Sequence, residues 1–298
     1  MSAQNRSLSH KVEKLDPVRV TFLAIAHVLA VVGLFNFTWN AFYAFLVMYA
    51  VTGLGITFGY HRLFTHRSFK VPKFIETLAA LGGTLAMQGN VFRWVAHHRM
   101  HHAYSDKARD PHDASRGFWY SHILWVCYVD RQRDKVENLR PFARDIFADK
   151  TLMRMSSDTF MVAIQIMLLI GLWAIGGWQV MLWGVWVRMV AVYHATWFVN
   201  SAAHKWGYRN YRDADLATNC WWVSLLTFGE GWHNNHHAHS QVAPAGRQWW
   251  ELDTTWQLIK LLRVLGLATD IKLPPALAFD PNAITAPIDY GRKLVNER

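Results

Sequence analysis

Three short histidine-rich segments contain the residues of this chain best suited to chemistry. Their sequences are HRLFTH, HRMHH and HNNHH, and they supply eight imidazoles: His61, His66, His98, His101, His102, His233, His236 and His237. Neutral imidazole is the commonest protein ligand for iron, copper and zinc. The two cysteines, Cys127 and Cys220, form no CxxC pair, so no thiolate metal site is expected, and both fall in segments expected to be cytoplasmic, so no disulfide is expected. The histidines are therefore predicted to hold a metal centre with more than one ion.

The spacing within the second segment favours two metal ions. Residues three and four apart lie on one side of a helix, so His98 shares a side with His101 and His102. The neighbours His101 and His102 diverge by about 100°. One is expected to reach one metal and its neighbour the other. The third segment repeats this HxxHH pattern.

The first segment and a ninth histidine have spacings that differ from HxxHH. His61 and His66 are five residues apart, about 140° on a straight α-helix, so some unwinding is expected there. His204 follows Asn200 by four residues in NSAAH and is predicted to share its helix face. A lone histidine after an apolar run is usually a packed residue. His204, however, is expected on the same side of the membrane as the three histidine segments. His97 is out of the ligand spacing, and the remaining histidines are expected to be caps, turn residues or core: His10, His27, His112, His122, His194 and His239.

Long uncharged stretches predict an α-helical membrane protein that positions these ligands. Residues 21–60 contain no Asp, Glu, Lys or Arg, which is enough for two spans of roughly 30 Å joined at NFTWN, residues 36–40. A second such stretch runs over 159–200, interrupted by Arg188 and with a turn at Gly176 and Gly177. We expect one domain, 1–298, with four transmembrane helices in two hairpins, at about 20–35, 41–59, 159–175 and 178–200. A helical cap is expected over 61–158 and 201–298.

The basic residues predict the orientation of this fold. Both predicted turns lack Lys and Arg, so both termini and the histidine clusters are expected to face the cytoplasm. The shorter apolar stretches 74–91 and 221–228 are expected to be interfacial or cap helices. No cleavable signal peptide is expected, because the first residues are polar and charged. A net charge of +10 fits an anionic membrane surface. Nucleic acid binding is not expected, because it would need a soluble basic face without membrane hairpins.

An all-imidazole centre with two metals at a membrane surface suits dioxygen chemistry on a hydrophobic substrate. Zinc hydrolysis needs only three protein ligands and an open position, so iron is favoured. The chain has no flavin or dinucleotide fingerprint and no HPGG-type haem segment. The glycine pairs Gly53 and Gly55, and Gly82 and Gly83, lie in apolar helices and are not expected to bind phosphate. Electrons are therefore expected from a separate carrier.

The order HRLFTH, HRMHH, NSAAH and GEGWHNNHH, with DPHDASRGFWYSH between, resembles the membrane fatty acyl desaturases of the stearoyl-CoA desaturase superfamily. The resemblance covers about residues 20–274 and is closest to the bacterial acyl-lipid and acyl-CoA delta-9 branch. It implies a diiron oxidoreductase that uses O2 and two electrons to place a cis double bond in an acyl chain. Nine histidines, with Asn200 acting through a water, are implied to hold the irons: His61, His66, His98, His101, His102, His204, His233, His236 and His237.

The resemblance also implies a bent acyl tunnel and residues that position the substrate. The positions that match the family's bend are Gln88, Trp94 and Thr196; without the family, Trp94 and Thr196 would be interpreted as packing residues. Arg93 and Arg188 are candidates for the polar end of the substrate, although Arg188 could equally extend to the membrane interface. Carboxylates are expected to orient the ligand histidines, and the candidates are Glu230, Asp106 and Asp110. Asp110 precedes Pro111 and could instead start a turn.

The resemblance leaves the substrate carrier and the electron donor open. Animal acyl-CoA enzymes have an aspartate where this chain has His97, so an acyl group on a glycerolipid is at least as well supported as one on coenzyme A. No cytochrome domain is expected after Arg298, which leaves ferredoxin, rubredoxin or free cytochrome b5 as the donor. Two alternatives remain. A hydroxylase or ketolase would insert oxygen with similar histidines, and a metal transporter would place its ligands near the middle of the membrane.

Overall fold

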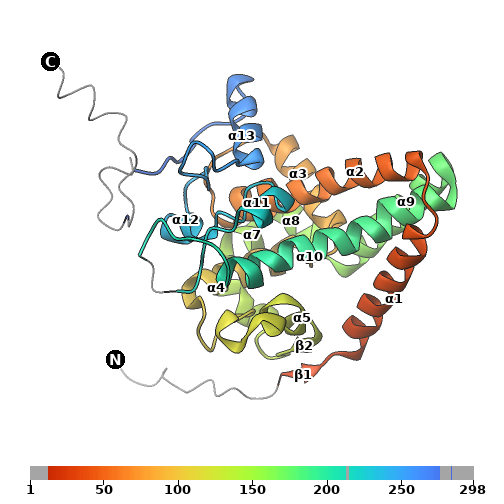
Figure 1. Ribbon diagram of the computed structural model, residues 1–298, viewed down its shortest axis with the longest axis horizontal. Coiled ribbons are helices and arrows are strands. Elements are labelled where there is room, and N and C mark those ends of the chain that lie inside the picture. Colours follow the sequence, from red (N-terminus) through yellow and green to blue (C-terminus); the bar gives the residue numbers. More distant parts are fainter. Residues whose placement is uncertain (1–12, 213–214, 276–282, 284–298) are drawn as a thin grey trace.

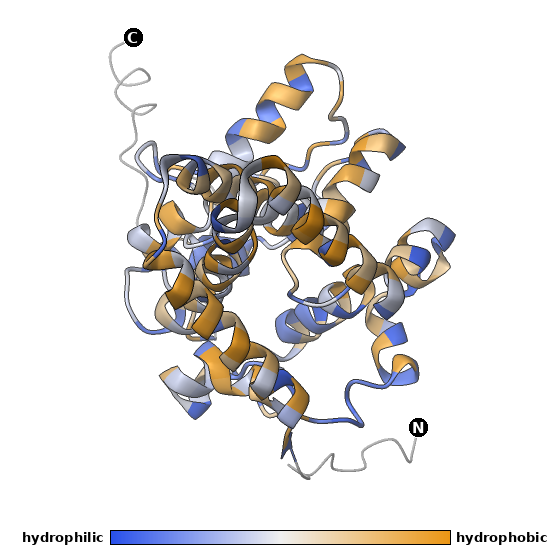
Figure 2. Cartoon of the chain, turned by 90° about the vertical axis from the view of Figure 1, so that its right-hand side faces the viewer, coloured by the Kyte–Doolittle hydropathy of each residue, from blue (hydrophilic) through white to orange (hydrophobic). Residues whose placement is uncertain are grey.

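The computed structural model describes residues 13–212, 215–275 and 283. Within them, three helical stretches are long and apolar enough to cross a membrane: 17–34, 39–65 and 158–204. Figure 1 shows α1, α2 and α9 towards one end of the molecule and α11, α12 and α13 towards the other. Apolar side chains such as Ile25, Val28 and Ile170 are exposed along the long helices, which carry much of the hydrophobic colour in Figure 2. These exposed surfaces are suited to lipid contact.

The first two spans are joined by a short turn. Helix α1 (Pro17–Leu34) begins at Asp16, whose side chain accepts hydrogen bonds from the first backbone N–H groups. Helix α2 (Trp39–Leu54) is capped in the same way by Thr38. It continues without a break into a π-helix, η1 (Gly55–Thr65), so the helical stretch extends six residues beyond the predicted end at Gly59.

The third apolar stretch consists of α9 (Asp158–Met181), the π-helix η5 (Leu182–Val187) and α10 (Arg188–Ser201). It is not one straight rod, because Gly177 has φ 77° and ψ −173°, a conformation outside the helical region. Leu172, before this turn, lies against Gly184, after it: a Cβ on Gly184 would come within 2.6 Å of Leu172 Cδ1. The two arms therefore pack against each other.

Shorter elements build the rest of the molecule. Two strands, β1 (Lys14–Leu15) and β2 (Tyr128–Val129), pair antiparallel and tie the start of the described chain to its middle. The other elements are α3 (Lys73–Leu85), α4 (Val91–Tyr104), η2 (Ala114–Arg116), η3 (Tyr120–Leu124), α5 (Trp125–Cys127), α6 (Val136–Leu139), η4 (Arg140–Phe142), α7 (Arg144–Ala148), α8 (Lys150–Met155), η6 (Ala202–His204), α11 (Trp221–Leu226), α12 (His233–Ala238) and α13 (Thr254–Val264).

Glycines let helix α3 approach η1 closely. A Cβ on Gly55 would lie 2.2 Å from the carbonyl carbon of Gly82, and a Cβ on Gly59 would lie 2.9 Å from the carbonyl oxygen of Ala79. Only residues without a side chain permit such backbone contact. These glycines therefore serve helix packing.

The expected helix over 74–91 is too long. Helix α3 ends at Leu85, because Met87 and Gly89 both have positive φ, 58° and 101°, which ends a right-handed helix. Gln88 therefore lies in a turn between α3 and α4 rather than inside an apolar helix. Helix α11 is also short, and it exposes Trp221 and Leu225, as suits an interfacial helix.

Candidate metal centre

The π-helix η1 fixes the two histidines of the first segment. The backbone N–H of His66 donates to the carbonyl oxygen of His61 over 3.1 Å, the five-residue hydrogen bond that defines a π-helix. The two rings then lie with centroids 4.7 Å apart. The expectation that the helix departs from α geometry here is confirmed. The expected unwinding takes the form of a wider, π-helical turn.

The ligand nitrogens of all nine predicted histidines gather in two groups, each with its atoms within 4.8 Å of one another. The first group is His61, His66, His98, His102 and His236, and the second is His101, His204, His233 and His237. Helices α4 and α12 each contribute to both groups, because neighbouring residues such as His101 and His102 point in different directions. The divergence predicted from the HxxHH spacing is confirmed.

His204 belongs to the second group, but its backbone conformation differs from the one expected. Helix α10 ends at Ser201, and His204 lies in the 3-10 turn η6. The expected α-helix from Asn200 to His204 is therefore interrupted, because its last three residues form a 3-10 turn. The His204 ring still lies 4.9 Å from that of His233.

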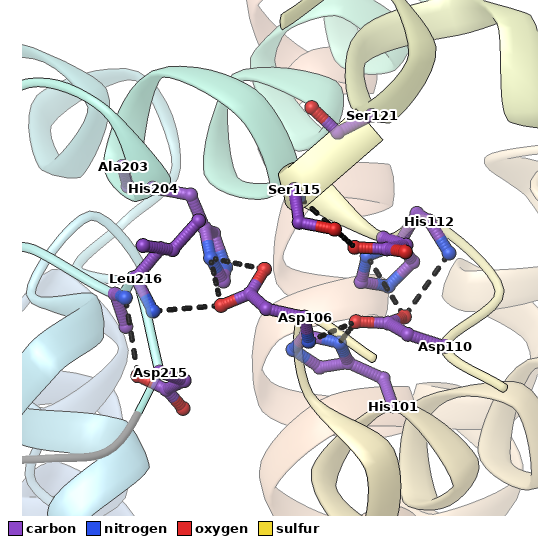
Figure 3. Close-up of polar contacts among 12 residues, drawn as sticks. His101, Asp106, Asp110, His112, Ser115, Ser121, Ala203, His204, Asp215 and Leu216 are labelled. Atoms are coloured by element: carbon purple, nitrogen blue, oxygen red, sulfur yellow. Dashed lines mark hydrogen bonds and ion pairs between the residues drawn. The ribbon is translucent and has the colours of Figure 1, made fainter. Parts of the chain in front are cut away.

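Four carboxylates hold the outer nitrogens of four ligand histidines. Nδ1 of His61 lies 2.8 Å from Glu230, and Nδ1 of His101 lies 2.8 Å from Asp110. In the second group, His204 pairs with Asp106 at 3.3 Å and His237 with Asp215 at 2.5 Å. Figure 3 shows Asp106 reaching His204 and the backbone of Leu216, and Asp110 placed between His101 and His112. Such pairing fixes both the tautomer and the orientation of a metal-binding imidazole.

The tautomers imply a cation between His101 and His237. Each of these rings gives its Nδ1 hydrogen to a carboxylate, so each Nε2 of the neutral ring carries a lone pair. The two Nε2 atoms nevertheless face each other at 3.2 Å. Two lone pairs at that distance repel, and a metal ion that accepts both removes the repulsion. The donor set therefore fits a metal centre.

Burial keeps the ligand imidazoles neutral. It lowers the pKa of His66, His98, His101, His102, His233 and His236 well below the ordinary value of 6.5, and the neighbouring histidines lower it further. Only the unprotonated ring can bind a metal. These ligands are thus ready for a metal at neutral pH.

A buried ion network supports the first group from behind. The Arg62 guanidinium, 3% exposed, donates to Glu230 over 3.0 Å and to Asp253 over 2.8 Å. Burial opposes the charge of Arg62, and these two carboxylates offset that cost. Glu230 therefore links Arg62 to His61, which orients the ligand.

Some residues at the centre were not found from the sequence. Glu230, Asp106 and Asp110 were predicted to orient ligands and do contact them, and Asp110 also accepts the backbone N–H of His112, so it makes a turn as well. Asp215 was missed, since nothing in its local sequence marks it. His112 was expected to be a cap, turn or core residue. It lies in a third group with His101 and Asp110, and its ring is centred 4.2 Å from that of His101.

The remaining histidines lie outside the two metal groups. His97 pairs with Asp134 at 3.0 Å. His27, His194 and His122 form a chain of contacts, each 3.0 Å, that joins α1, α10 and η3. The ring of His239 lies against Tyr211. His10 falls outside the described residues.

One of the three predicted tunnel residues contacts a histidine of the centre, and the other two contact each other. The Gln88 amide donates to Thr196 Oγ1 over 2.9 Å. The Trp94 ring stacks on His98, with centroids 5.0 Å apart and an angle of 20°. Thr196 also lines a small cavity with Tyr49, Ile56, Val192 and others. Trp94 therefore lies against a histidine of the first group, and Gln88 meets α10 at Thr196.

The two predicted substrate arginines are engaged with backbone. Arg93 donates to the carbonyl oxygen of Asp134 over 2.8 Å. Arg188 is fully buried and donates to the carbonyl oxygens of Gly184 and Leu85, over 3.1 and 2.8 Å. The alternative that Arg188 extends to the membrane interface is wrong, because its guanidinium ends inside the fold.

A polar cavity leads to the first metal group. It has a volume of about 450 Å³, and its lining includes the ligands His66 and His102 and the cations Arg67, Arg99 and Lys272. Asp145 pairs with both arginines. The cavity gives small or charged molecules a route to the ligands that avoids the apolar helices.

Comparison with known proteins adds family information to this geometry. The model of the fatty acid desaturase family matches residues 36–263. The chain is 47% identical to the sn-1 stearoyl-lipid 9-desaturase of Synechocystis sp. over 262 residues, 87% of this chain and 81% of that protein. It is 50% identical to the enzyme of the same name from Anabaena variabilis over 239 residues, 80% and 86% of the two chains. An acyl-CoA 5-desaturase of Anemone leveillei is 44% identical over 263 residues, 87% and 80% of the two chains.

Proposed function

The chain belongs to the fatty acid desaturase family, and on that premise we propose that it places a cis double bond at the delta-9 position of a saturated acyl chain carried on a glycerolipid. The observation that carries the proposal is the convergence of nine histidines in two groups, four of them held by carboxylates through Nδ1. This arrangement supplies two neighbouring metal positions with nitrogen ligands. The choice of a glycerolipid as carrier and of the delta-9 position rests on the relatives named stearoyl-lipid 9-desaturases.

We propose two iron ions as the metals and O2 as the co-substrate. Imidazole ligands suit iron, and two bound irons would activate O2. O2 would accept two hydrogens from unactivated methylene groups, together with two electrons from the carrier and two protons, and give two waters. The first group would hold one iron and the second group the other, with Asn200 acting through a water. The carboxylates keep the ligand rings oriented, and burial keeps them unprotonated.

The acyl chain is proposed to bend beside the first metal group. An apolar chain has no polar handle along its length, so only the shape of its channel can select the carbons that react. Gln88, Trp94 and Thr196 are proposed to line this bend, which is supported by the stacking of Trp94 on His98 and by the hydrogen bond from Gln88 to Thr196. Arg93 remains a candidate for the polar end of the substrate. A coenzyme A ester remains the second candidate carrier, because one relative is named an acyl-CoA desaturase.

We further propose one domain with four membrane spans in two hairpins. One hairpin turns at Asn36 and the other at Gly177. The positive φ of Gly177 supports dividing the third apolar stretch into two arms. The distribution of Lys and Arg supports a cytoplasmic position for the histidine centre. A separate one-electron carrier of the ferredoxin, rubredoxin or cytochrome b5 type would deliver electrons there, and the cavity at His66 and His102 offers an approach.

Lipid analysis of a host that expresses the chain tests this function. Gas chromatography and mass spectrometry should find acyl chains that have lost two hydrogens and gained no oxygen, which separates desaturation from the hydroxylase or ketolase alternative. His101→Ala should give none, because it removes a ligand. Purified protein given stearoyl-glycerolipid or stearoyl-CoA, with a reductase and ferredoxin, would identify the carrier. Metal transport into vesicles without any lipid product would instead support a transporter.

A further inference from the structure

The turn between α3 and α4 is held in a strained shape. It spans residues 86–90 and carries Gln88, whose amide meets Thr196. Met87, next to Gln88, has φ 58°, which an L side chain adopts only when its surroundings enforce it. The position of Gln88 therefore depends on contacts that other elements make with this turn.

Arg188 makes one of those contacts from the first residue of α10. Its Nη1 donates to the carbonyl oxygen of Leu85 over 2.8 Å, and its Nε donates to Gly184 in the preceding turn of its own helix. Leu85 is the last residue of α3, where unpaired carbonyls and the helix dipole concentrate negative charge. A buried cation is stabilised at such a position. Among the described residues, no carboxylate pairs with Arg188.

Two more side chains hold the same turn. Gln165 of α9 donates to the carbonyl oxygen of Leu85 over 3.0 Å. The Tyr193 hydroxyl, on α10, donates to the carbonyl oxygen of Met87 over 2.7 Å. Successive turns of α10 thus present Arg188, Tyr193 and Thr196 to Leu85 at the end of α3 and to Met87 and Gln88 in the turn that follows.

We propose that Arg188 is a positioning residue that determines where the double bond is placed. It fixes the α3–α4 turn against α10, and so sets how far Gln88 lies along the acyl channel, without touching the substrate itself. Burying a guanidinium without a carboxylate partner costs free energy. Removing the Arg188 contact would release the adjoining turn, which carries the strained Met87. This inference rests on the proposed desaturase function and reassigns Arg188 from the polar end of the substrate to the bend.

The test measures double-bond position and metal content on the same preparations. Arg188→Lys keeps the charge but replaces the guanidinium fork by a single ammonium, and Tyr193→Phe removes only the hydrogen bond to Met87. Both should retain the wild-type metal content and place a fraction of the double bonds at neighbouring carbons. Their rate should fall by about ten- to a hundredfold, since a displacement of about 1 Å can cost roughly a hundredfold. Arg188→Met should have the largest effect.

Matched controls separate this role from a general loss of fold. Arg263→Lys and Tyr43→Phe change exposed residues and should behave like the wild type. If Arg188→Met does not accumulate, Arg188→Lys and Tyr193→Phe decide the question. A single, unchanged double-bond position in both would overturn the inference while the desaturase function stands. A wild-type protein that forms no double bond would instead overturn the proposed function.

Discussion

His66 donates its backbone N–H to the carbonyl oxygen of His61 over 3.1 Å, so these two histidines, both proposed as metal ligands, are joined by one wide turn of π-helix. In an α-helix the same two residues would diverge by about 140° and could not serve one metal. The π-helix thus converts a five-residue spacing into a shared metal group. Its packing against α3, through glycines, keeps it in place.

The first prediction concerns that packing. Gly55→Ala should lower the stability of the protein by about 1–3 kcal/mol, because overpacking of a close contact forces backbone shifts. The added Cβ would lie 2.2 Å from the backbone of Gly82. Gly171→Ala, a helical glycine with nothing within 4 Å of its Cβ position, is the control and should be neutral or slightly stabilising. Thermal unfolding in detergent and metal content measure both. Equal melting temperatures for the two variants would contradict the prediction.

The second prediction concerns Asp215. Asp215→Asn should weaken metal binding to the second group by about 10- to 100-fold, because such carboxylates fix the tautomer and raise the basicity of the ligand ring. Asp215 contacts only His237 among the ligands of that group. Asp130→Asn, outside the centre, is the control. Titration of metal-free protein with ferrous iron measures the affinity, and an unchanged affinity would show that His237 needs no carboxylate.

The third prediction is a loss of stability in mild acid. The pKa values of six buried ligand histidines are lowered below 6.5 in the fold. Above about 6.5 both folded and unfolded chains hold these rings neutral, and below it only the unfolded chain takes up protons. Each such ring removes about 1.4 kcal/mol of stability per pH unit. The melting temperature of metal-free protein should therefore fall steeply between pH 6.5 and 5. A flat profile over that range would show that the rings are accessible to protons in the fold.

The fourth prediction concerns Trp94. Trp94→Ala should open the acyl channel, lower the rate and scatter the double-bond position, while both metals stay bound because Trp94 is not a ligand. Trp94→Phe retains an aromatic ring against His98 and should scatter the position less. Metal analysis and double-bond location on the same preparations test this. Full activity with an unchanged position would remove Trp94 from the channel, and lost metal would make it a packing support for His98.

The sequence by itself determined the family, the nine clustered histidines and the long apolar helices. Helical geometry acts over three or four residues, so the HxxHH spacing in α4 and α12 was enough to divide neighbouring histidines between two metal groups. The uncharged stretches likewise predicted where the long helices lie, because membrane thickness sets their length.

Only the tertiary structure decided what holds these ligands and the α3–α4 turn. Arg62 meets Glu230 and Asp253 across 168 and 191 positions, and Arg188 meets Leu85 across 103. No local pattern marks such partners, because their side chains meet only after the helices pack. The π-helix at His61 and the early end of α3 are further examples. In both, contacts with neighbouring elements select a backbone shape that helical periodicity alone does not predict.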